Sequence, residues 1–182
     1  LQKLFTDSSE VQRYPNDVYT HVMVERFLKV PWYYPVVANK PIQLGHAASK
    51  YDYDNFAWID SHMWSSSASF HDKEFMDSYD WMSMVDRLVQ TAQDRMFLWK
   101  MPEYAVCSGA FMVGGKSAIS TFVDRYTQRL DQLVDQGHVR SEERIIYEMP
   151  VKTPELFNMI LTNGYYDIIQ REKAQHITSL LP

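Results

Sequence analysis

The sequence predicts a protein of the α/β or α+β class. Short apolar segments of strand length alternate along the chain with longer segments whose apolar residues recur at helical spacing. The chain has 182 residues, of which 46% are hydrophobic and 23% are charged. This size and composition are typical of one globular domain, so we expect a single domain over residues 1–182.

The first half of the chain carries signals for one helix and one strand. Residues 41–50 begin with proline and bear a modest apolar stripe, which indicates a helix with proline in its first turn. The two prolines within residues 30–35 predict a break before it. Residues 55–60 are apolar and aromatic and stop at a carboxylate, as in a buried strand that ends at a sheet edge. Residues 61–73, rich in serine, indicate a loop.

The middle of the chain predicts a helix followed by two strands. Apolar residues at i, i+3, i+4 and i+7 spacing indicate a helix over residues 77–95, with Asp77 and Ser78 as its caps. Residues 95–99 and 106–113 are short and apolar, and we expect both to be strands.

The clearest element of the sequence is a helix over residues 116–136. One apolar stripe runs along it, and Gly137 is expected to end it. Ser141 is expected to begin the next helix, with acidic residues in the first turn and a stop at Pro150. Residues 153–161 then predict a further helix.

Charge and composition exclude several classes of function. The formal net charge is −5 and no block of lysine and arginine occurs, so the basic surface that binds duplex nucleic acid is not expected. No segment has the ~20 apolar residues of a membrane span. The single cysteine, Cys107, excludes an internal disulfide and a cysteine-based zinc site. It also agrees with a reducing compartment, so we expect a cytoplasmic protein, with peripheral membrane association as the alternative.

The first candidate site is the carboxylate at the end of residues 55–60. A carboxylate at the exit of a buried strand faces the edge where open α/β sheets bind ligands. Asp60 suits a hard divalent cation that also contacts phosphates, because such an ion needs only one or two protein carboxylates. His62 is the candidate second ligand. The alternative is an aspartate that caps a turn, with His62 on the surface.

The second candidate is the glycine-containing segment Cys107–Ser117. It ends in a Gly-Gly-Lys-Ser sequence, but Ala110 stands where a G-x-x-x-x-G-K-[ST] phosphate loop has its first glycine, so that loop is not predicted. Adjacent glycines let the backbone approach a ligand or another strand closely, and the start of the following helix can receive an anion. A simple strand-to-helix turn is the alternative.

The third candidate is the acidic pair in Ser141-Glu142-Glu143-Arg144. Paired acids at a helix start can provide a general base or bind sugar hydroxyls. Ordinary capping is the alternative, because carboxylates are favourable near the positive end of the helix dipole.

These three segments occur in an order that resembles a known family. Phe56-Ala57-Trp58-Ile59-Asp60 comes first, Ser108–Gly115 and a long amphipathic helix follow, and Ser141–Ile146 comes last. Over residues 36–148 this arrangement is similar to the HtrL/YibB-type glycosyltransferase-like family, itself similar to GT-A-type nucleotide-diphospho-sugar transferases. The resemblance implies an α/β fold with a GT-A-like, Rossmann-like central mixed sheet flanked by helices.

The resemblance also implies a function and a set of site residues. The implied activity is transfer of a sugar from a nucleoside-diphosphate donor to a saccharide or another hydroxyl acceptor, with Mn²⁺ or Mg²⁺ as cofactor. Asp60 falls on the metal-binding aspartate, and Glu142 and Glu143 fall on the acidic pair that supplies a catalytic base or binds the sugar. The implied substrate-binding residues are Trp58, Gly109, Phe111, Gly114 and Gly115.

Two other classes of function stay open. A metal-dependent phosphohydrolase would need several converging carboxylates and histidines, and only Asp60 and His62 are close in sequence. A non-catalytic glycosyltransferase-like domain that binds a glycan or a partner is favoured by the Glu-Glu pair and by the short segment of residues 1–56 before the aspartate motif. That short segment indicates either a compact domain or an N-terminally incomplete one.

Overall fold

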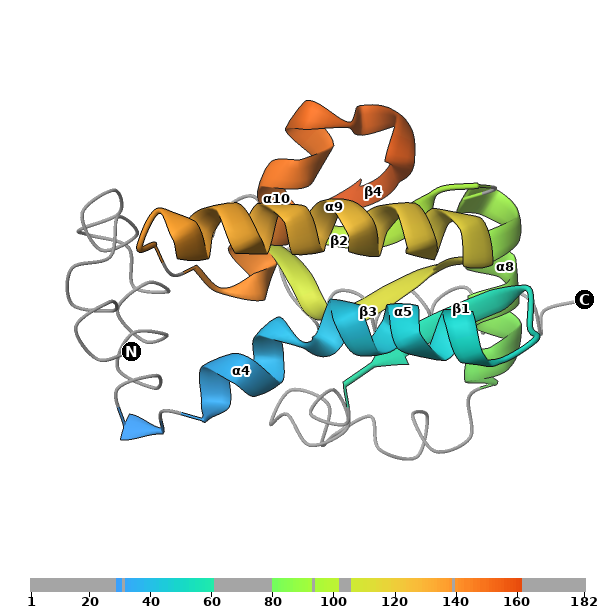
Figure 1. The fold of residues 1–182 in the computed structure, drawn as a ribbon. Coiled ribbons are helices and arrows are strands. Elements are labelled where there is room, and N and C mark those ends of the chain that lie inside the picture. Colours follow the sequence, from blue (N-terminus) through green and yellow to red (C-terminus); the bar gives the residue numbers. More distant parts are fainter. Residues whose placement is uncertain are drawn as a thin grey trace, which may run out of the picture.

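In the part of the chain that it describes, the computed structural model contains a four-stranded mixed sheet with helices packed against it (Figure 1). It describes residues 29–30, 32–60, 80–92, 94–101, 106–138 and 140–161. The strands lie in the order β1-β3-β2-β4 across the sheet. The predicted α/β class, with a mixed sheet flanked by helices, is confirmed.

Three of the four strands, all except β4, form where the sequence predicts them. The strands are β1 (Asn55–Ile59), β2 (Met96–Met101), β3 (Val106–Gly115) and β4 (Phe157–Leu161). β3 lies between β1 and β2 and is antiparallel to both, while β2 and β4 are parallel. The Cα partners run from Asn55 opposite Gly115 to Ile59 opposite Phe111, and this register decides which residues share an end of the sheet.

The predicted helix over residues 153–161 is wrong. Only Pro154–Leu156 form a single 3₁₀ turn, and β4 follows at once. A short buried apolar run fits a strand as well as a helix segment, so periodicity could not decide between them. The parallel edge of β2 supplies hydrogen-bond partners for this run, from Met96 opposite Phe157 to Lys100 opposite Leu161.

Helices α5 and α9 lie side by side along the sheet (Figure 1). The helices are α4 (Tyr33–Ala38), α5 (Lys40–Lys50), α8 (Trp81–Ala92), α9 (Lys116–Asp135) and α10 (Glu142–Lys152). Successive strand residues point to opposite faces, so Met96, Leu98 and Met112 share one buried core with α5, α9 and α10. Phe122 of α9 is completely buried in that core. The amphipathic stripe of α9 therefore forms the main contact that attaches this helix to the sheet.

Proline positions account for two differences from the expected helices. α4 begins at Tyr33, inside the predicted break, and holds Pro35 in its first turn, where the missing N–H would have no helical partner in any case. α10 runs through Pro150 to Lys152 instead of stopping. Its end is closed by Thr153, whose N–H and hydroxyl both donate to the carbonyl of Met149 at 3.0 Å.

The start of α8 is capped by Asp80, and not by the residues predicted from the sequence. The carboxylate of Asp80 accepts a hydrogen bond from the backbone N–H of Ser83 at 3.0 Å, which is the geometry of an N-cap. Hydrogen bonds from Ser83 also lower the pKa of Asp80 below its ordinary 3.8. The predicted caps, Asp77 and Ser78, lie outside the described residues.

Gly137 ends α9 as predicted, and its backbone conformation leads to a first testable prediction. Its φ of 71° lies in the left-handed region, which residues with a Cβ adopt at a cost. We expect Gly137→Ala to lower the free energy of unfolding by about 1 kcal/mol in urea denaturation. Gln136→Ala, at the exposed neighbouring position, is the control and should change it by less than ~0.5 kcal/mol. Equal effects would show that the left-handed turn is not the cause.

Candidate functional site

Four charged side chains meet at the carboxyl end of β1. Lys40, Asp60, Glu142 and Glu143 form what we call the Asp60 cluster. The ammonium nitrogen of Lys40 lies 2.7 Å from Oδ2 of Asp60 and 3.5 Å from Oε1 of Glu142. The first and third candidate segments of the sequence thus lie together, joined by a lysine.

The sheet holds Asp60 in place. It directly follows β1, and its backbone N–H donates to the carbonyl of Ala110 at 2.7 Å, which continues the hydrogen bonding between β1 and β3 by one residue. Its side chain keeps 27% of its surface exposed, so it is only partly shielded from solvent. This is the strand-end position that the sequence predicts for Asp60.

The N-terminus of α10 brings the acidic pair to β3. Ser141 caps the helix as predicted, because its hydroxyl accepts from the N–H of Arg144 at 3.4 Å. The N–H of Gly109 then donates to Oε1 of Glu143 at 3.1 Å. A Cβ built on Gly109 would lie 2.9 Å from Oε1 of Glu142, closer than such atoms approach in proteins. A glycine at position 109 therefore lets the helix start approach the strand.

Burial changes the acidity of Glu142. Its relative exposure is 2%, and within the described part of the chain its Oε2 has no hydrogen-bond partner. Removal from water, together with the neighbouring charge of Glu143, raises the pKa of Glu142 from 4.5 to about 7, against the lowering effect of Lys40. This carboxylate can therefore gain or lose a proton near neutral pH.

The ammonium of Lys40 is held charged by the same cluster. Burial alone would lower its pKa, but the charges of Glu142 and Asp60 outweigh burial and raise the pKa above 10.5. With all groups ionised, one ammonium faces three carboxylates, so the cluster keeps a negative charge. The buried hydroxyl of Tyr126 donates to the carbonyl of Ala38 at 3.0 Å, which attaches α9 to the chain two residues before Lys40.

Lys40 is not among the site residues predicted from the sequence. One signal could have identified it: Lys40 lies four and eight residues before Leu44 and Ala48, both buried, and therefore on the inner face of α5. A lysine on a buried helix face needs a carboxylate partner. The sequence does not show which carboxylate that is.

The other predicted substrate-binding residues belong to the packing of the sheet or lie at its far end. Phe111 is completely buried. Its ring packs edge to face against that of Trp99, with 4.2 Å between the ring centroids, so Phe111 belongs to the packing of the sheet. Trp58 is half-buried against the core, and its indole N–H has no acceptor among the described residues. Gly114 and Gly115 pair with Phe56 and Asn55, at the opposite end of β1 from Asp60.

The register of β1 and β3 separates the glycine pair from the acidic residues. Asp60 comes five residues after Asn55 along the extended strand, a distance of about 16 Å. The structure therefore brings Gly109 to the Asp60 cluster but leaves Gly114 and Gly115 at the far end of the same strand. A Cβ on Gly114 would lie 2.7 Å from the sulfur of Met96, so close packing explains this glycine.

The donor atoms of the cluster suit a hard divalent cation only in part. Asp60 and the acidic pair offer carboxylate oxygens, the ligands that Mg²⁺ and Mn²⁺ take. No three histidine, cysteine, aspartate or glutamate side chains are arranged to hold a metal ion among the residues that the structure describes. His62 lies outside those residues. The half-exposed Asp60 thus fits an ion that also takes oxygen ligands from its substrate, because one protein carboxylate is then enough.

Comparison with protein-family models, with curated protein sequences and with solved structures finds no significant match to this chain. Among the described helices, none has both the length and the apolar composition needed to cross a bilayer.

Proposed function

We propose that this chain is a divalent-metal-dependent glycosyltransferase domain of the GT-A type, which moves a sugar from a nucleoside-diphosphate donor to a saccharide or other hydroxyl acceptor. The observation that carries the proposal is the meeting of Asp60 with Glu142 at one end of the sheet, through Lys40. The resemblance of three ordered sequence segments to the HtrL/YibB-type family pointed to these two carboxylates separately. Their proximity is the arrangement that a shared site requires.

Asp60 would hold the metal ion in this proposal. When bound, Mn²⁺ or Mg²⁺ supplies positive charge that stabilises the leaving diphosphate. The hydrogen bond from its backbone N–H to Ala110 holds the backbone of Asp60 at the end of the sheet, and this places the carboxylate there. Lys40 lies at hydrogen-bond distance from the same carboxylate and orients it.

The acidic pair would act on the acceptor hydroxyl. A general base works best when its pKa lies near the operating pH, and the pKa of Glu142, about 7, meets that condition. Glu143 is the more exposed member of the pair and is oriented by the N–H of Gly109. In an inverting transfer this pair takes the proton of the acceptor hydroxyl, whereas in a retaining transfer it orients the substrate.

A ligand-binding measurement tests this function. We expect nucleoside diphosphates with Mn²⁺ to raise the melting temperature more than either component alone. At a hundredfold excess over Kd the gain is about 2.7 kcal/mol, or roughly 5 to 10 °C for a chain of this length. Asp60→Asn should lose this shift because an amide carries no charge for the ion.

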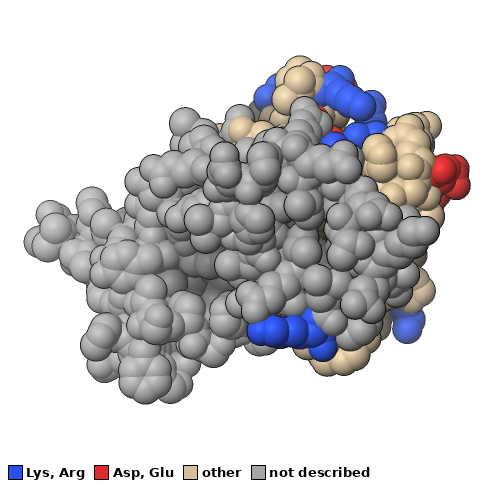
Figure 2. All heavy atoms as spheres, turned by 90° about the vertical axis from the view of Figure 1, so that its left-hand side faces the viewer, with Lys and Arg blue, Asp and Glu red and all other residues tan. Residues whose placement is uncertain are grey.

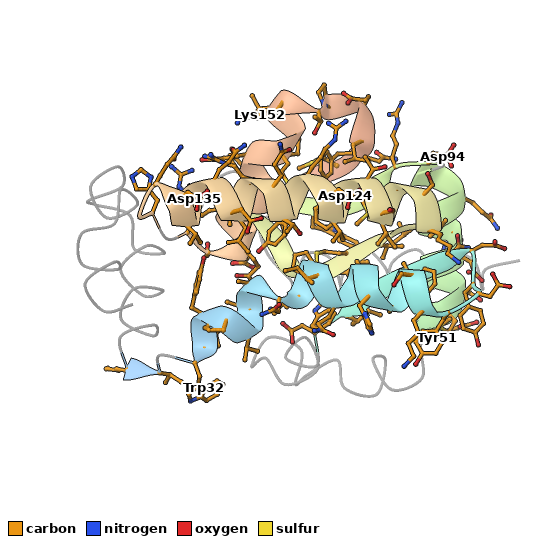
Figure 3. The ribbon with its side chains drawn as sticks, in the orientation of Figure 1. Trp32, Tyr51, Asp94, Asp124, Asp135 and Lys152 are labelled. Carbon is orange, nitrogen blue, oxygen red and sulfur yellow. The ribbon has the colours of Figure 1, made fainter. Side chains whose placement is uncertain are left out.

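The matched control is Asp124→Asn. Asp124 is an exposed carboxylate on α9 (Figure 3), and its replacement should leave the Mn²⁺-dependent shift intact. An unchanged shift in Asp60→Asn would remove Asp60 from the metal site. No shift with any diphosphate in the wild-type protein would contradict the transferase.

One observation favours a second candidate, a non-catalytic glycosyltransferase-like domain that binds a glycan or a partner. The ammonium of Lys40 already balances Asp60 at 2.7 Å, as in an ion pair whose role is structural. For this candidate, the binding experiment should give no Mn²⁺-dependent shift, and Asp60→Asn should lower stability alone.

A further inference from the structure

A concave surface apart from the Asp60 cluster lies between α9 and α10. It has a volume of about 260 Å³ and is lined by side chains of both helices and by Thr153, directly after α10. Lys152 stands at the last residue of α10, ten residues after Glu142, which is about 15 Å along a helix. The pocket therefore uses the later turns of α10, and the Asp60 cluster uses the first.

Positive charge dominates this pocket. Arg125, Arg129 and Lys152 line it, and Glu148 is the one acidic lining residue among those that the structure describes. Figure 2 shows Lys and Arg side chains gathered at the top of the molecule, where Figure 1 places α10. Three basic groups against one carboxylate indicate a preference for an anion.

The one carboxylate of the pocket is already engaged by two arginines. Arg129 approaches Oε2 of Glu148 at 3.3 Å, and Arg140 contacts Oε1 of the same group. Lys152 has no ion-pair partner within the described ranges. Arg125 lies 3.6 Å from Glu155, but both side chains are exposed, and ion pairs between exposed side chains are weak. Among the described residues, the positive charge of the pocket is therefore only partly balanced by neighbouring carboxylates.

Arg129 also keeps hydrogen-bonding capacity. A guanidinium carries five N–H donors. The hydrogen bond to Glu148 uses Nη2, and Nε of Arg129 is buried with no acceptor in the described part of the structure. Arginine binds carboxylates and phosphates with two parallel hydrogen bonds, which requires unused donors of this kind.

We propose that the pocket between α9 and α10 binds the oxyanion group of a small molecule, a phosphate ester or a carboxylate, through Arg125, Arg129 and Lys152. Ile145 and Met149 give the pocket an apolar wall for the body of such a ligand. The volume suits a small molecule and not a polymer. This site is separate from the Asp60 cluster, whose excess of carboxylates repels an oxyanion that arrives without a metal ion.

Titration with inorganic phosphate and with citrate tests the proposal, after metal ions have been removed by dialysis against EDTA and then against chelator-free buffer. Isothermal calorimetry should detect binding of at least one probe to the wild-type protein. The double variant Arg125→Gln/Lys152→Gln removes two exposed charges and should weaken binding at least tenfold. Lys50→Gln, which removes an exposed charge from α5 outside the pocket, should leave binding unchanged.

The pattern of results distinguishes the ligand chemistry from a general charge effect. Tighter binding of phosphate supports a phosphate ester as the ligand, and tighter binding of citrate supports a carboxylate. Backbone amide resonances within residues 145–153, apart from Pro150, which has no N–H, should shift during the same titration of the wild-type protein, which tests the location without any variant. Binding of neither probe, equal weakening in Lys50→Gln, or undiminished binding in the double variant would overturn the proposal.

Discussion

Glu142→Gln should remove a large pH dependence from the folding stability and stabilise the protein at pH 8 by about 3 kcal/mol. The pKa of Glu142 rises from 4.5 to about 7 on folding, mainly because the group is buried. Between these two pH values the folded protein keeps the proton that the unfolded chain has lost. The contribution of Glu142 is therefore most favourable below pH 4.5 and is lost as the pH rises through about 7. Glutamine carries no charge to bury at any pH.

The measurement is urea denaturation of both proteins at pH 5 and pH 8. The two free energies of unfolding should be similar at pH 5 and should separate at pH 8. Glu155→Gln, which replaces a carboxylate with 67% exposure, controls for the loss of a negative charge at the surface. Parallel pH profiles for the wild type and Glu142→Gln would mean that the folded protein does not resist ionisation of Glu142.

Lys40→Met should destabilise the protein by about 3 to 5 kcal/mol at pH 8, because it leaves a buried carboxylate without its counter-charge. The ammonium of Lys40 lies 2.7 Å from Asp60 and 3.5 Å from Glu142, and its side chain is 13% exposed. The cost should be smaller at pH 5, where Glu142 is protonated in the folded protein. Since folding raises the pKa of Lys40 above 10.5, its stabilisation is present below that pH and is lost above it.

A double-mutant cycle separates the ion pairs from simple loss of packing. Lys40→Met/Glu142→Gln should be more stable at pH 8 than the sum of the single effects predicts, by ~0.5 to 3 kcal/mol. Lys50→Met, an exposed lysine on the same helix, should change stability by less than ~0.5 kcal/mol. Additive single effects would show that Lys40 and Glu142 do not stabilise one another.

Several elements could be predicted because their determinants lie within a few residues. β1 ends at Ile59, where the apolar run meets the carboxylate of Asp60. α9 follows one apolar stripe and ends at Gly137, whose left-handed φ needs no contact from elsewhere. Ser141 caps α10 with its own hydroxyl. In each of these cases the interaction that decides the structure is local.

Other elements could not be predicted because distant partners decide them. Phe157–Leu161 has no periodicity that identifies a strand, and β2 makes it one by offering an unpaired parallel edge. Pro150 lacks an N–H and disturbs the preceding turn, and yet α10 continues to Lys152, where Thr153 completes the helix end. Neither outcome could be read from the nearby residues alone.

In the candidate site, too, some features follow from local sequence and others depend on distant partners. The sequence by itself determined that Asp60 ends a strand and that Glu142 begins a helix, since both follow from local patterns. Only the tertiary structure decided that Lys40 lies between them, that Gly109 gives α10 room to approach β3, and that Gly114 and Gly115 lie at the other end of the sheet. The physical reason is that the energy of a charge depends on its distance from other charges and from water, and strand register and helix packing set both distances.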